Sequence, residues 1–274
     1  MEILKKYVSL QSINVMATLL FDQIVYGPVR SRRLGVSLGI NLSPPDGKRC
    51  TFDCIYCECG LNMERITHSP APSRENVRIA LAGKLAQMKT EGFLPDVITF
   101  SGNGEPTMHP EFAGIIADTI DMRDKLCPST KVAVLSNSTM LHKEEVMQAL
   151  CKVDESLMKF DAATDELITL IDQPAIPDFT AQKLINHLVR FKGKLAVQTM
   201  FLQGAYQDIR IDNTRVEDVE KWVDALHIIQ PEKVMIYTIN RETPVKSLTK
   251  IPSETLEKIA DKVRATGFHV TVSS

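Results

Sequence analysis

Three cysteines stand close together in this chain, at the spacing Cys-x-x-x-Cys-x-x-Cys. They are Cys50, Cys54 and Cys57. Three thiolates at this spacing can ligate three corners of a cuboidal iron–sulfur cluster and leave the fourth iron open. Electron-transfer [4Fe–4S] centres usually close all four corners with cysteine, so a three-cysteine site suits a cluster that binds a substrate at iron. The sequence therefore predicts a [4Fe–4S] cluster with one open position.

A fourth cysteine allows a second interpretation of the same segment. Cys59 follows Cys57 by two residues, and the four cysteines together can surround one zinc ion. Structural zinc sites usually combine two short knuckles with a longer spacer, so the cluster is the favoured interpretation. Cys59 is then either a spare or substrate-facing thiol, or a fourth ligand that would close the open iron.

Size and charge set the general class of protein. The chain has 274 residues, of which 44% are hydrophobic, and this is enough for one sizeable core. A net charge of −2 provides no overall field that would attract nucleic acid. Arg30, Arg32 and Arg33 form a local basic group that can clamp a phosphate or a carboxylate, or can be solvated surface charge. RNA is therefore a permitted partner and not an indicated one.

Cysteine usage and the N-terminus predict a cytoplasmic protein with no membrane segment. Clustered cysteines in a chain of this length indicate metal binding or catalysis more than a disulfide framework. Polar residues between Ser9 and Asn14 interrupt the apolar run that a signal peptide needs, and no segment is long and apolar enough to span a bilayer. We expect residues 1–24 to form an N-terminal extension and residues 25–274 to form one domain.

Short β-branched runs alternate with longer amphipathic stretches, which is the pattern of βα units around a parallel sheet. The expected strands are Gly35–Leu42, Val97–Phe100, Lys131–Leu135, Ser156–Phe160, Lys194–Phe201, Lys233–Ile239 and His269–Val272. The expected helices are Arg74–Thr90, Pro110–Lys125, Lys143–Ala149, Thr180–Lys192, Val216–Gln230 and Ser253–Thr266. The resulting six βα units fit either a doubly wound sheet or an incomplete barrel.

Polar or metal-binding residues follow the first four expected strands. The cysteines come after the first strand, residues 102–105 after the second, Ser136 and Asn137 after the third, and Asp161 after the fourth. Ligands of parallel α/β folds bind at the carboxyl ends of the strands. The four groups therefore predict a single site at one end of the sheet.

Together these motifs resemble the radical S-adenosylmethionine (SAM) superfamily. Tyr56, an aromatic residue just before the third cysteine, completes the cluster pattern, and Gly102-Asn103-Gly104-Glu105-Pro106 is similar to the superfamily's Gly-Gly-Glu-Pro motif. The resemblance implies an α/β fold, a partial (β/α)6 TIM-like barrel. It also implies a [4Fe–4S] cluster on Cys50, Cys54 and Cys57, and an oxidoreductase that cleaves SAM reductively to act on an unidentified substrate.

The resemblance further implies which residues contact SAM. They are Tyr56, Gly102, Asn103, Gly104, Glu105, Ser136, Asn137 and Asp161. Backbone groups of the Gly-Asn-Gly-Glu segment would receive the amino group, and the later residues would meet the ribose hydroxyls or the methionine moiety. Each also has an ordinary alternative as a turn residue or a helix cap. Lys159, on the same side of its strand as Asp161, either reaches a carboxylate of SAM or substrate or is a solvated lysine.

The segment from Val25 to Leu42 narrows the resemblance to a branch of iron–sulfur oxidoreductases that includes wyosine-type tRNA-modifying enzymes. Archaeal wyosine-forming enzymes carry additional N-terminal cysteines for a second cluster, whereas this chain has no cysteine before Cys50. The branch implies a reducing partner such as flavodoxin or ferredoxin. The substrate class stays open among small molecules, RNA and protein.

Other functions fit the same cysteine motif. An activase would abstract hydrogen from a glycine of a partner protein. A non-catalytic electron carrier or redox sensor would have its open iron closed by an exogenous ligand or by Cys59. A zinc-binding scaffold is a third alternative. The leading hypothesis is an enzyme that cleaves SAM to start radical chemistry.

Overall fold

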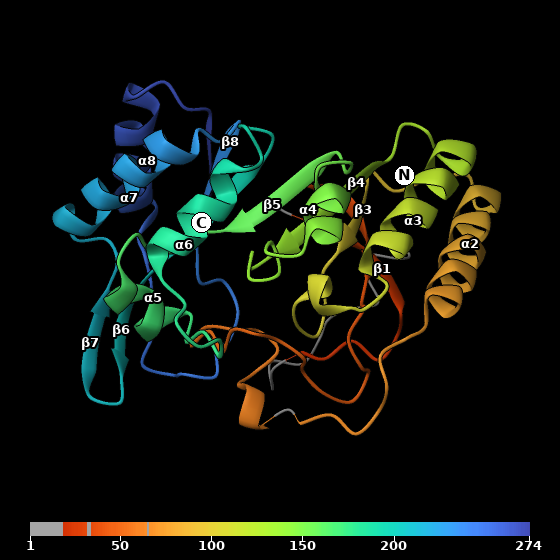
Figure 1. Cartoon of the computed structure of the whole chain (residues 1–274), viewed down its shortest axis with the longest axis horizontal. Coiled ribbons are helices and arrows are strands. Elements are labelled where there is room, and N and C mark those ends of the chain that lie inside the picture. The colour runs from red at the N-terminus through yellow and green to blue at the C-terminus, as the bar shows by residue number, and fades with distance from the viewer. Residues whose placement is uncertain (1–18, 32–33, 65) are drawn as a thin grey trace.

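A curved sheet runs through the residues that the computed structural model describes, 19–31, 34–64 and 66–274. The strand order is β1-β2-β3-β4-β5-β6-β8-β10, and β7 and β9 pair with the C-terminal half of β6, where β6 and β7 protrude as a hairpin at the lower left of Figure 1. The strands are β1 (Val25–Ser31), β2 (Gly35–Ile40), β3 (Val97–Phe100), β4 (Lys131–Ser136), β5 (Glu155–Lys159), β6 (Ala196–Tyr206), β7 (Ile209–Asp212), β8 (Lys233–Thr238), β9 (Thr249–Lys250) and β10 (Val270–Ser273).

Helices connect the parallel strands of this sheet. From β2 to β10 each neighbouring pair along the order is parallel, whereas β1 is antiparallel to β2. The helices are α2 (Arg74–Thr90), α3 (Phe112–Leu126), α4 (Glu144–Leu150), α5 (Asp165–Ile171), α6 (Ala181–Val189), α7 (Val216–Ile229) and α8 (Ser253–Ala265), with short 3₁₀ turns η1 (Asn62–Glu64) and η2 (Pro106–Met108). The six predicted βα units are confirmed.

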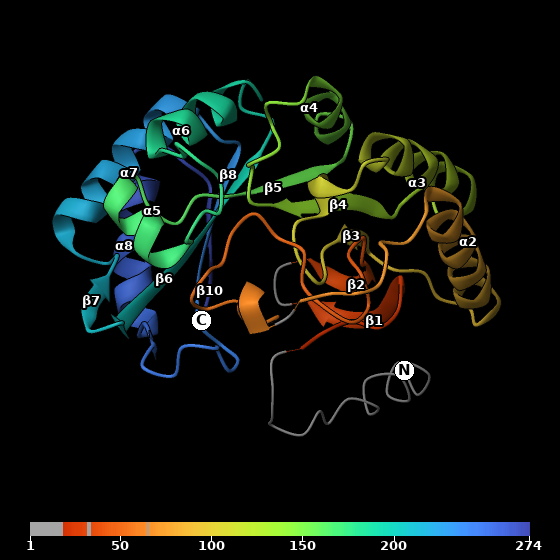
Figure 2. The ribbon, with the colours of Figure 1, turned by 60° about the horizontal axis from the view of Figure 1, so that its bottom comes forward.

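The helices lie along the convex side of the sheet, and the segment after β2 crosses its concave side (Figure 2). A doubly wound sheet would carry helices on both faces, so this arrangement is an open, partial barrel. The predicted α/β partial-barrel class is confirmed. The predicted N-terminal extension comprises residues 1–24, and its residues 1–18 lie outside the described part of the chain.

Successive side chains of each strand point to opposite faces of the sheet, and this produces two separate apolar layers. Ile98 and Phe100 of β3 belong to the large core between the sheet and the helices. On the opposite, concave face the small cluster of Val97, Ala133, Leu157, Ala196 and Met235 fills the sheet near the amino ends of the strands. The next concave positions on β5 and β6, Lys159 and Gln198, are polar and stand side by side in register. The concave side thus has an apolar floor and a polar upper part.

Several elements escaped the sequence prediction for identifiable reasons. β1 contains Gly27 and Pro28, which interrupt a strand pattern. The proline is tolerated there because β1 is the edge strand of the sheet. α5 is only seven residues long, too short for a clear helical period. β6 continues to Tyr206 instead of ending near Phe201, because its second half pairs with β7 and β9, and Gly204 within it resembles a loop signal.

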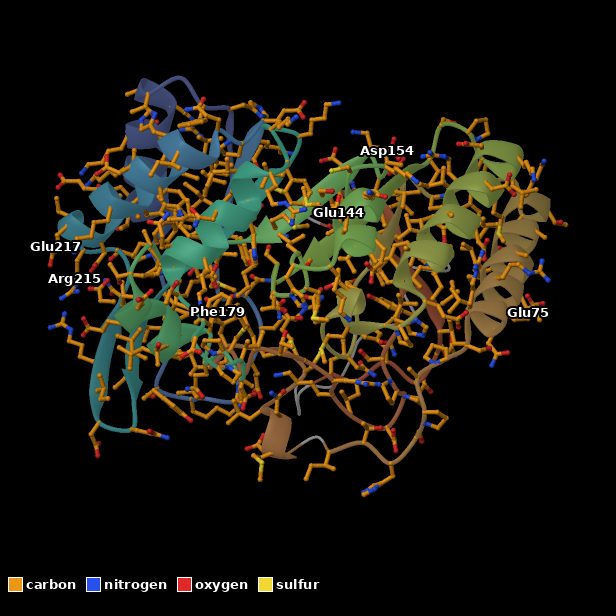
Figure 3. The ribbon with its side chains drawn as sticks, in the orientation of Figure 1. Glu75, Glu144, Asp154, Phe179, Arg215 and Glu217 are labelled. Carbon is orange, nitrogen blue, oxygen red and sulfur yellow. The ribbon has the colours of Figure 1, made fainter. Side chains whose placement is uncertain are left out.

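Charged side chains cover the outer helices. Glu75, Glu144 and Glu217 are labelled in Figure 3 on this outer layer, and the first two pair with Arg78 and Arg190 at 2.6 Å. Exposed ion pairs of this kind contribute about 1 kcal/mol or less. They make the helical surface polar and do not mark a functional site.

The packing of β6 against α7 gives a test of the core. Phe201 is 1% exposed, and its ring meets Trp222 edge-on at 5.3 Å between centroids. We expect Phe201→Ala to lower the free energy of unfolding by about 3–5 kcal/mol, because it leaves a cavity in a packed core. Urea unfolding can be followed by the fluorescence of Trp222, the single tryptophan. Ile209→Ala on β7, where Ile209 is 49% exposed, should change stability by less than about 0.5 kcal/mol; similar losses in both variants would contradict this description of the core.

Candidate functional site

The three predicted cluster ligands lie on one irregular segment, residues 48–62, called here the cysteine loop. Cys50, Cys54 and Cys57 are partly exposed, whereas Cys59 is buried. Tight turns shape the loop: the Cys57 amide donates to the Cys54 carbonyl at 3.0 Å, and the Gly60 amide donates to the Cys57 carbonyl at 2.9 Å. The three predicted ligands are therefore carried by a compact backbone.

Backbone hydrogen bonds attach the start of the cysteine loop to the end of β3. The Arg49 amide donates to the Asn103 carbonyl at 2.9 Å, and the Glu105 amide donates to the Arg49 carbonyl at 3.0 Å. Gly104, between them, has a φ of +143°, and a Cβ there would overlap the Arg49 carbonyl. Glycine is needed at this position because the cysteine loop packs directly on the backbone.

A second attachment joins the loop to the segment after α5. The Asp53 amide donates to the Asp172 carbonyl at 2.9 Å, and the Ile55 amide donates to the Ile171 carbonyl at 3.0 Å. Phe52 packs edge-on against Phe179, labelled in Figure 3, at 5.3 Å between centroids. The loop is thus held from both sides, by the end of β3 and by the α5 region.

The surroundings of Cys50 and Cys57 shift the pKa values of the two thiols in opposite directions. Burial raises the pKa of Cys50 to about 12, with the nearby Glu105 carboxylate adding to it. A hydrogen bond with Cys59 lowers the pKa of Cys57 to about 6, and the Lys48 ammonium adds to that effect. Lys48 is 6% exposed and donates to the Gly60 carbonyl at 2.8 Å. Burial works against its charge, but the neighbouring Cys57, Cys50 and Cys54 outweigh it and raise its pKa.

The donor set of the cysteine loop fits an iron–sulfur cluster. Its ligands would be thiolates, which are the donors that such clusters take, and Lys48 supplies a buried positive charge beside them. Within the described residues, no group of three or more His, Cys, Asp or Glu side chains is gathered tightly enough to hold a single metal ion. A cuboidal cluster places each thiolate on a different iron, so its ligands stand further apart than those of one ion.

Asn103, at the position where the motif has glycine, connects three parts of the chain. It is fully buried, and its side-chain amide donates to the Phe21 and Pro44 carbonyls at 2.8 and 3.0 Å. Its side-chain oxygen accepts from the Phe21 amide at 2.8 Å. Gly102 beside it lies against Asn41, where any side chain would overlap. Asn103 therefore fixes the segment before β1 and the loop before the cysteines, a role that the sequence analysis missed.

Glu105 joins the ends of β3 and β4. The residue is 4% exposed, and its carboxylate accepts hydrogen bonds from the Asn137 amide at 2.7 Å and the Ser136 hydroxyl at 2.8 Å. It also accepts from the amide and hydroxyl of Thr107. Burial raises its pKa even though these bonds oppose the shift. Three predicted site residues, Glu105, Ser136 and Asn137, therefore form one hydrogen-bonded group at the strand ends.

Asp161 lies at the centre of a buried ionic group below the cysteine loop. Its carboxylate accepts from the Tyr56 hydroxyl, the Lys159 ammonium and, at 2.8 Å, the Met200 amide. Lys159 also lies 4.3 Å from the Tyr56 ring centroid and 3.2 Å from a carboxylate oxygen of Asp172. Burial opposes its charge, but Asp161 and Asp172 outweigh burial and raise its pKa well above the usual value. Lys159 is therefore a fixed cation, not a solvated lysine.

Asp172 was not predicted as a site residue. It caps the C-terminus of α5 and is 2% exposed. Burial raises its pKa to about 7, with the charge of Lys159 acting in the opposite direction. Its only signal in the sequence is an acidic residue after a short apolar run, and its pairing with Lys159 depends on the tertiary fold.

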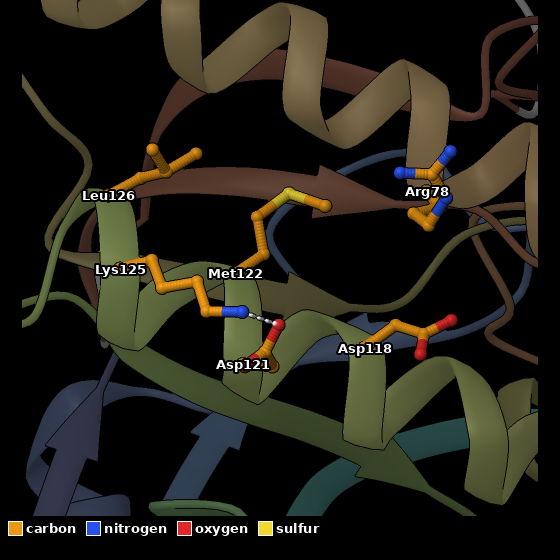
Figure 4. A pocket seen from close by; sticks show the side chains of 6 residues that line it. All are labelled: Arg78, Asp118, Asp121, Met122, Lys125 and Leu126. Atoms are coloured by element: carbon orange, nitrogen blue, oxygen red, sulfur yellow. Dashed lines mark hydrogen bonds and ion pairs between the residues drawn. The ribbon is translucent and has the colours of Figure 1, made fainter.

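Only one residue of the predicted basic group is described by the structure. Arg30 is exposed on the edge strand β1, and Arg32 and Arg33 lie outside the described residues. A cavity of about 220 Å³ lies elsewhere, on the outer layer between α2 and α3 (Figure 4). Its lining is Arg78, Asp118, Asp121, Met122, Lys125 and Leu126. It shares no residue with the strand-end site.

Within the described residues, no helix has the length and apolar character needed to cross a membrane.

Solved structures share this fold. A radical SAM methyltransferase from Sphaerobacter thermophilus superposes with a TM-score of 0.64 at 15% identity, over 86% of this chain and 65% of that one. Streptococcus suis SuiB bound to S-adenosylmethionine gives 0.59 at 14% identity, over 84% and 49%. TYW1 with a lysine–pyruvate adduct gives 0.58 at 15% identity, over 84% and 73%. The chain thus shares its fold with these radical SAM enzymes and with TYW1, as the sequence motifs predicted.

Curated relatives identify the family. A UPF0026 protein from Synechocystis sp. is 30% identical over 232 residues, which cover 81% of this chain and 77% of that protein. The chain belongs to the UPF0026 family. It is also 29% identical over 247 residues to a protein named GTPase Obg from Brachyspira hyodysenteriae, of which it spans 32%. No protein-family model matches the chain.

The contact between Gly104 and Arg49 can be tested by substitution. We expect Gly104→Ala to displace the cysteine loop and to lower the free energy of unfolding by at least about 2 kcal/mol, since it adds an overlap to backbone strain. Gly92→Ala is the matched control, because Gly92 also has a positive φ, +81°, but has open space at the Cβ position. Chemical denaturation of both variants gives the comparison, and equal losses would show that the overlap with Arg49 does not matter.

The buried carboxyl of Asp172 predicts a pH dependence of stability. Between about pH 4 and 7 the folded protein holds a proton on Asp172 that the unfolded chain has lost, so this group's contribution to stability falls as pH rises. Asp172→Asn removes the effect. Its stability relative to wild type should increase from pH 5 to 7 by on the order of 1 kcal/mol per pH unit. Denaturant unfolding across this range measures it; Asp208→Asn, an exposed turn residue, serves as control. A difference independent of pH would disprove the assignment.

Proposed function

We propose that this protein is a radical SAM enzyme that holds a [4Fe–4S] cluster through Cys50, Cys54 and Cys57. The observation that carries the proposal is the backbone attachment of the cysteine loop, which bears these three thiols, to the end of β3 in a fold shared with a radical SAM enzyme. These three cysteines would hold the cluster, and when bound it would supply one electron for the reductive cleavage of SAM, the chemistry that starts hydrogen abstraction from a substrate.

In this proposal the protein's main contribution is rigid positioning. The backbone bonds to Asn103 and Asp172 fix the two sides of the cysteine loop. The Tyr56 hydroxyl, bonded to Asp161, fixes the residue before the third ligand. Lys48 offsets part of the negative charge that the thiolates bring to the loop.

SAM would bind at the strand ends, over the segment from Gly102 to Glu105 and beside Ser136, Asn137 and Asp161. The carboxylates of Glu105 and Asp161 already accept several hydrogen bonds from the protein. We therefore assign direct SAM recognition mainly to backbone groups of this segment and to Tyr56, with the two carboxylates as supports. The SAM-bound SuiB structure, which shares the fold, supports a SAM site in this architecture.

The buried lysines are proposed to act as cations and not as nucleophiles. A lysine forms an imine with a carbonyl compound only as the neutral amine. Lys159 is paired with two carboxylates, and Lys48 lies among thiols and Asp53, so the pKa values of both are raised. An adduct like the lysine–pyruvate of the TYW1 structure is therefore not proposed for Lys48 or Lys159.

The electron donor would be a low-potential protein such as flavodoxin or ferredoxin, and the reaction would take place in the cytoplasm. All six cysteines are free thiols, which suits a reducing compartment. The substrate class stays open among small molecules, RNA and protein.

The proposal predicts SAM cleavage that depends on the cluster ligands. After anaerobic reconstitution and incubation with SAM and dithionite, wild type should release 5′-deoxyadenosine, and Cys54→Ala should release none above background, because the cluster has lost a ligand. Cys151→Ala is the matched control, since Cys151 is the exposed cysteine at the end of α4. It should retain wild-type product and wild-type iron and sulfide content.

The alternatives give different results. Zinc without sulfide in the purified protein would support the zinc scaffold. A fully loaded cluster that binds SAM, detected as a change in its EPR signal, but forms no product would indicate an enzyme that waits for its substrate. A loaded cluster with neither SAM binding nor product would support an electron carrier and reject the proposal.

A further inference from the structure

The side chain of Asn137 lies between the cysteine loop and the end of β4. Its amide nitrogen is 2.9 Å from the Thr51 hydroxyl and 3.6 Å from the Cys50 sulfur, in donor geometry to both. A primary amide has two N–H groups, so one hydrogen is available for each acceptor. The contact with sulfur lies within the range of N–H···S hydrogen bonds.

The orientation of this amide is determined by its neighbours. The side-chain oxygen of Asn137 accepts from the backbone amide of Thr139 at 3.1 Å and from the Thr139 hydroxyl at 2.7 Å. A backbone N–H can only donate, so the oxygen must face Thr139. The nitrogen must then face Cys50.

The backbone of Asn137 is fixed as well. Its amide donates to the buried Glu105 carboxylate at 2.7 Å, and the same carboxylate accepts from the Ser136 hydroxyl at 2.8 Å. Asn137 is 5% exposed. Since side chain and backbone are both held, the N–H group remains directed at the sulfur without help from a ligand.

We propose that Asn137 is a positioning residue that raises the reduction potential of the bound cluster by donating an N–H···S hydrogen bond to the Cys50 thiolate. Hydrogen bonds to the sulfurs are among the factors that set cluster potentials. The bond stabilises negative charge on sulfur, and this charge is larger in the reduced cluster, so the bond favours reduction. The inference rests on the proposed function, because it requires Cys50 to be a cluster ligand.

The test is the reduction potential of the reconstituted cluster without SAM, measured by EPR-monitored redox titration. Asn137→Leu keeps a similar size but removes both N–H donors, and its potential should fall. At the wild-type midpoint its ratio of reduced to oxidised cluster should drop several-fold, where a tenfold drop corresponds to 59 mV for a one-electron couple. Thr51→Val is the matched control: it removes the other acceptor of the same amide, leaves the bond to sulfur, and should keep the wild-type potential.

A second variant keeps the inference testable if Asn137→Leu binds its cluster poorly. Asn137→Asp retains the acceptor for Thr139, lacks the donor and adds negative charge, so its potential should also fall. A wild-type potential in the loaded Asn137 variants would overturn the inference, as would a weaker SAM affinity with an unchanged SAM-free potential, which would mark a SAM contact only. Equal shifts in Thr51→Val and Asn137→Leu would also overturn it. Failure of wild type to form any cluster would instead reject the proposed function.

Discussion

The architecture of the site depends on backbone hydrogen bonds that attach the cysteine loop to its neighbours. The loop is irregular and cannot satisfy its own polar groups, so its position is defined by the partners that it finds. The bonds of Arg49 with Asn103 and Glu105 fix its start, and the bonds to Ile171 and Asp172 fix the middle. These partners come from segments about 55 and about 120 residues away in the chain. The geometry of the three thiols is therefore a consequence of the tertiary fold.

The ionic group around Lys159 also helps to hold the cysteine loop in place, from below. Burying the Lys159 ammonium is unfavourable unless it is paired, and removing the Asp161 carboxylate would leave its charge uncompensated. Lys159 meets Asp161 and Asp172, and Asp161 also binds the Tyr56 hydroxyl. Because Asp172 also accepts from the cysteine loop through its carbonyl, the charged group and the loop are mutually dependent. This explains why a polar cluster persists above the apolar floor of the concave side.

The sequence was most informative where the signal was local. Periodicity located the parallel strands, and the residues that follow them, including Glu105 and Asn137, do lie together at one edge of the sheet. Roles that depend on distant partners were not readable: the buried position of Asp172, the pairing of β6 with β7 and β9, and the ties that Asn103 makes to Phe21. A one-residue motif match does not show whether a side chain faces a ligand or another part of the same chain.

Residues of the Gly-Asn-Gly-Glu segment are thus required by the fold itself. Gly104 is small because the Arg49 carbonyl lies against it, and Glu105 is acidic in a place where it accepts four hydrogen bonds from Thr107, Ser136 and Asn137. The same carboxylate that joins β3 to β4 also accepts from the backbone amide of Asn137, the residue whose side-chain amide is directed at Cys50. The strand ends, the cysteine loop and the surroundings of the Cys50 thiol therefore form one connected network, in which a change at Glu105 would reach the Cys50 sulfur through Asn137.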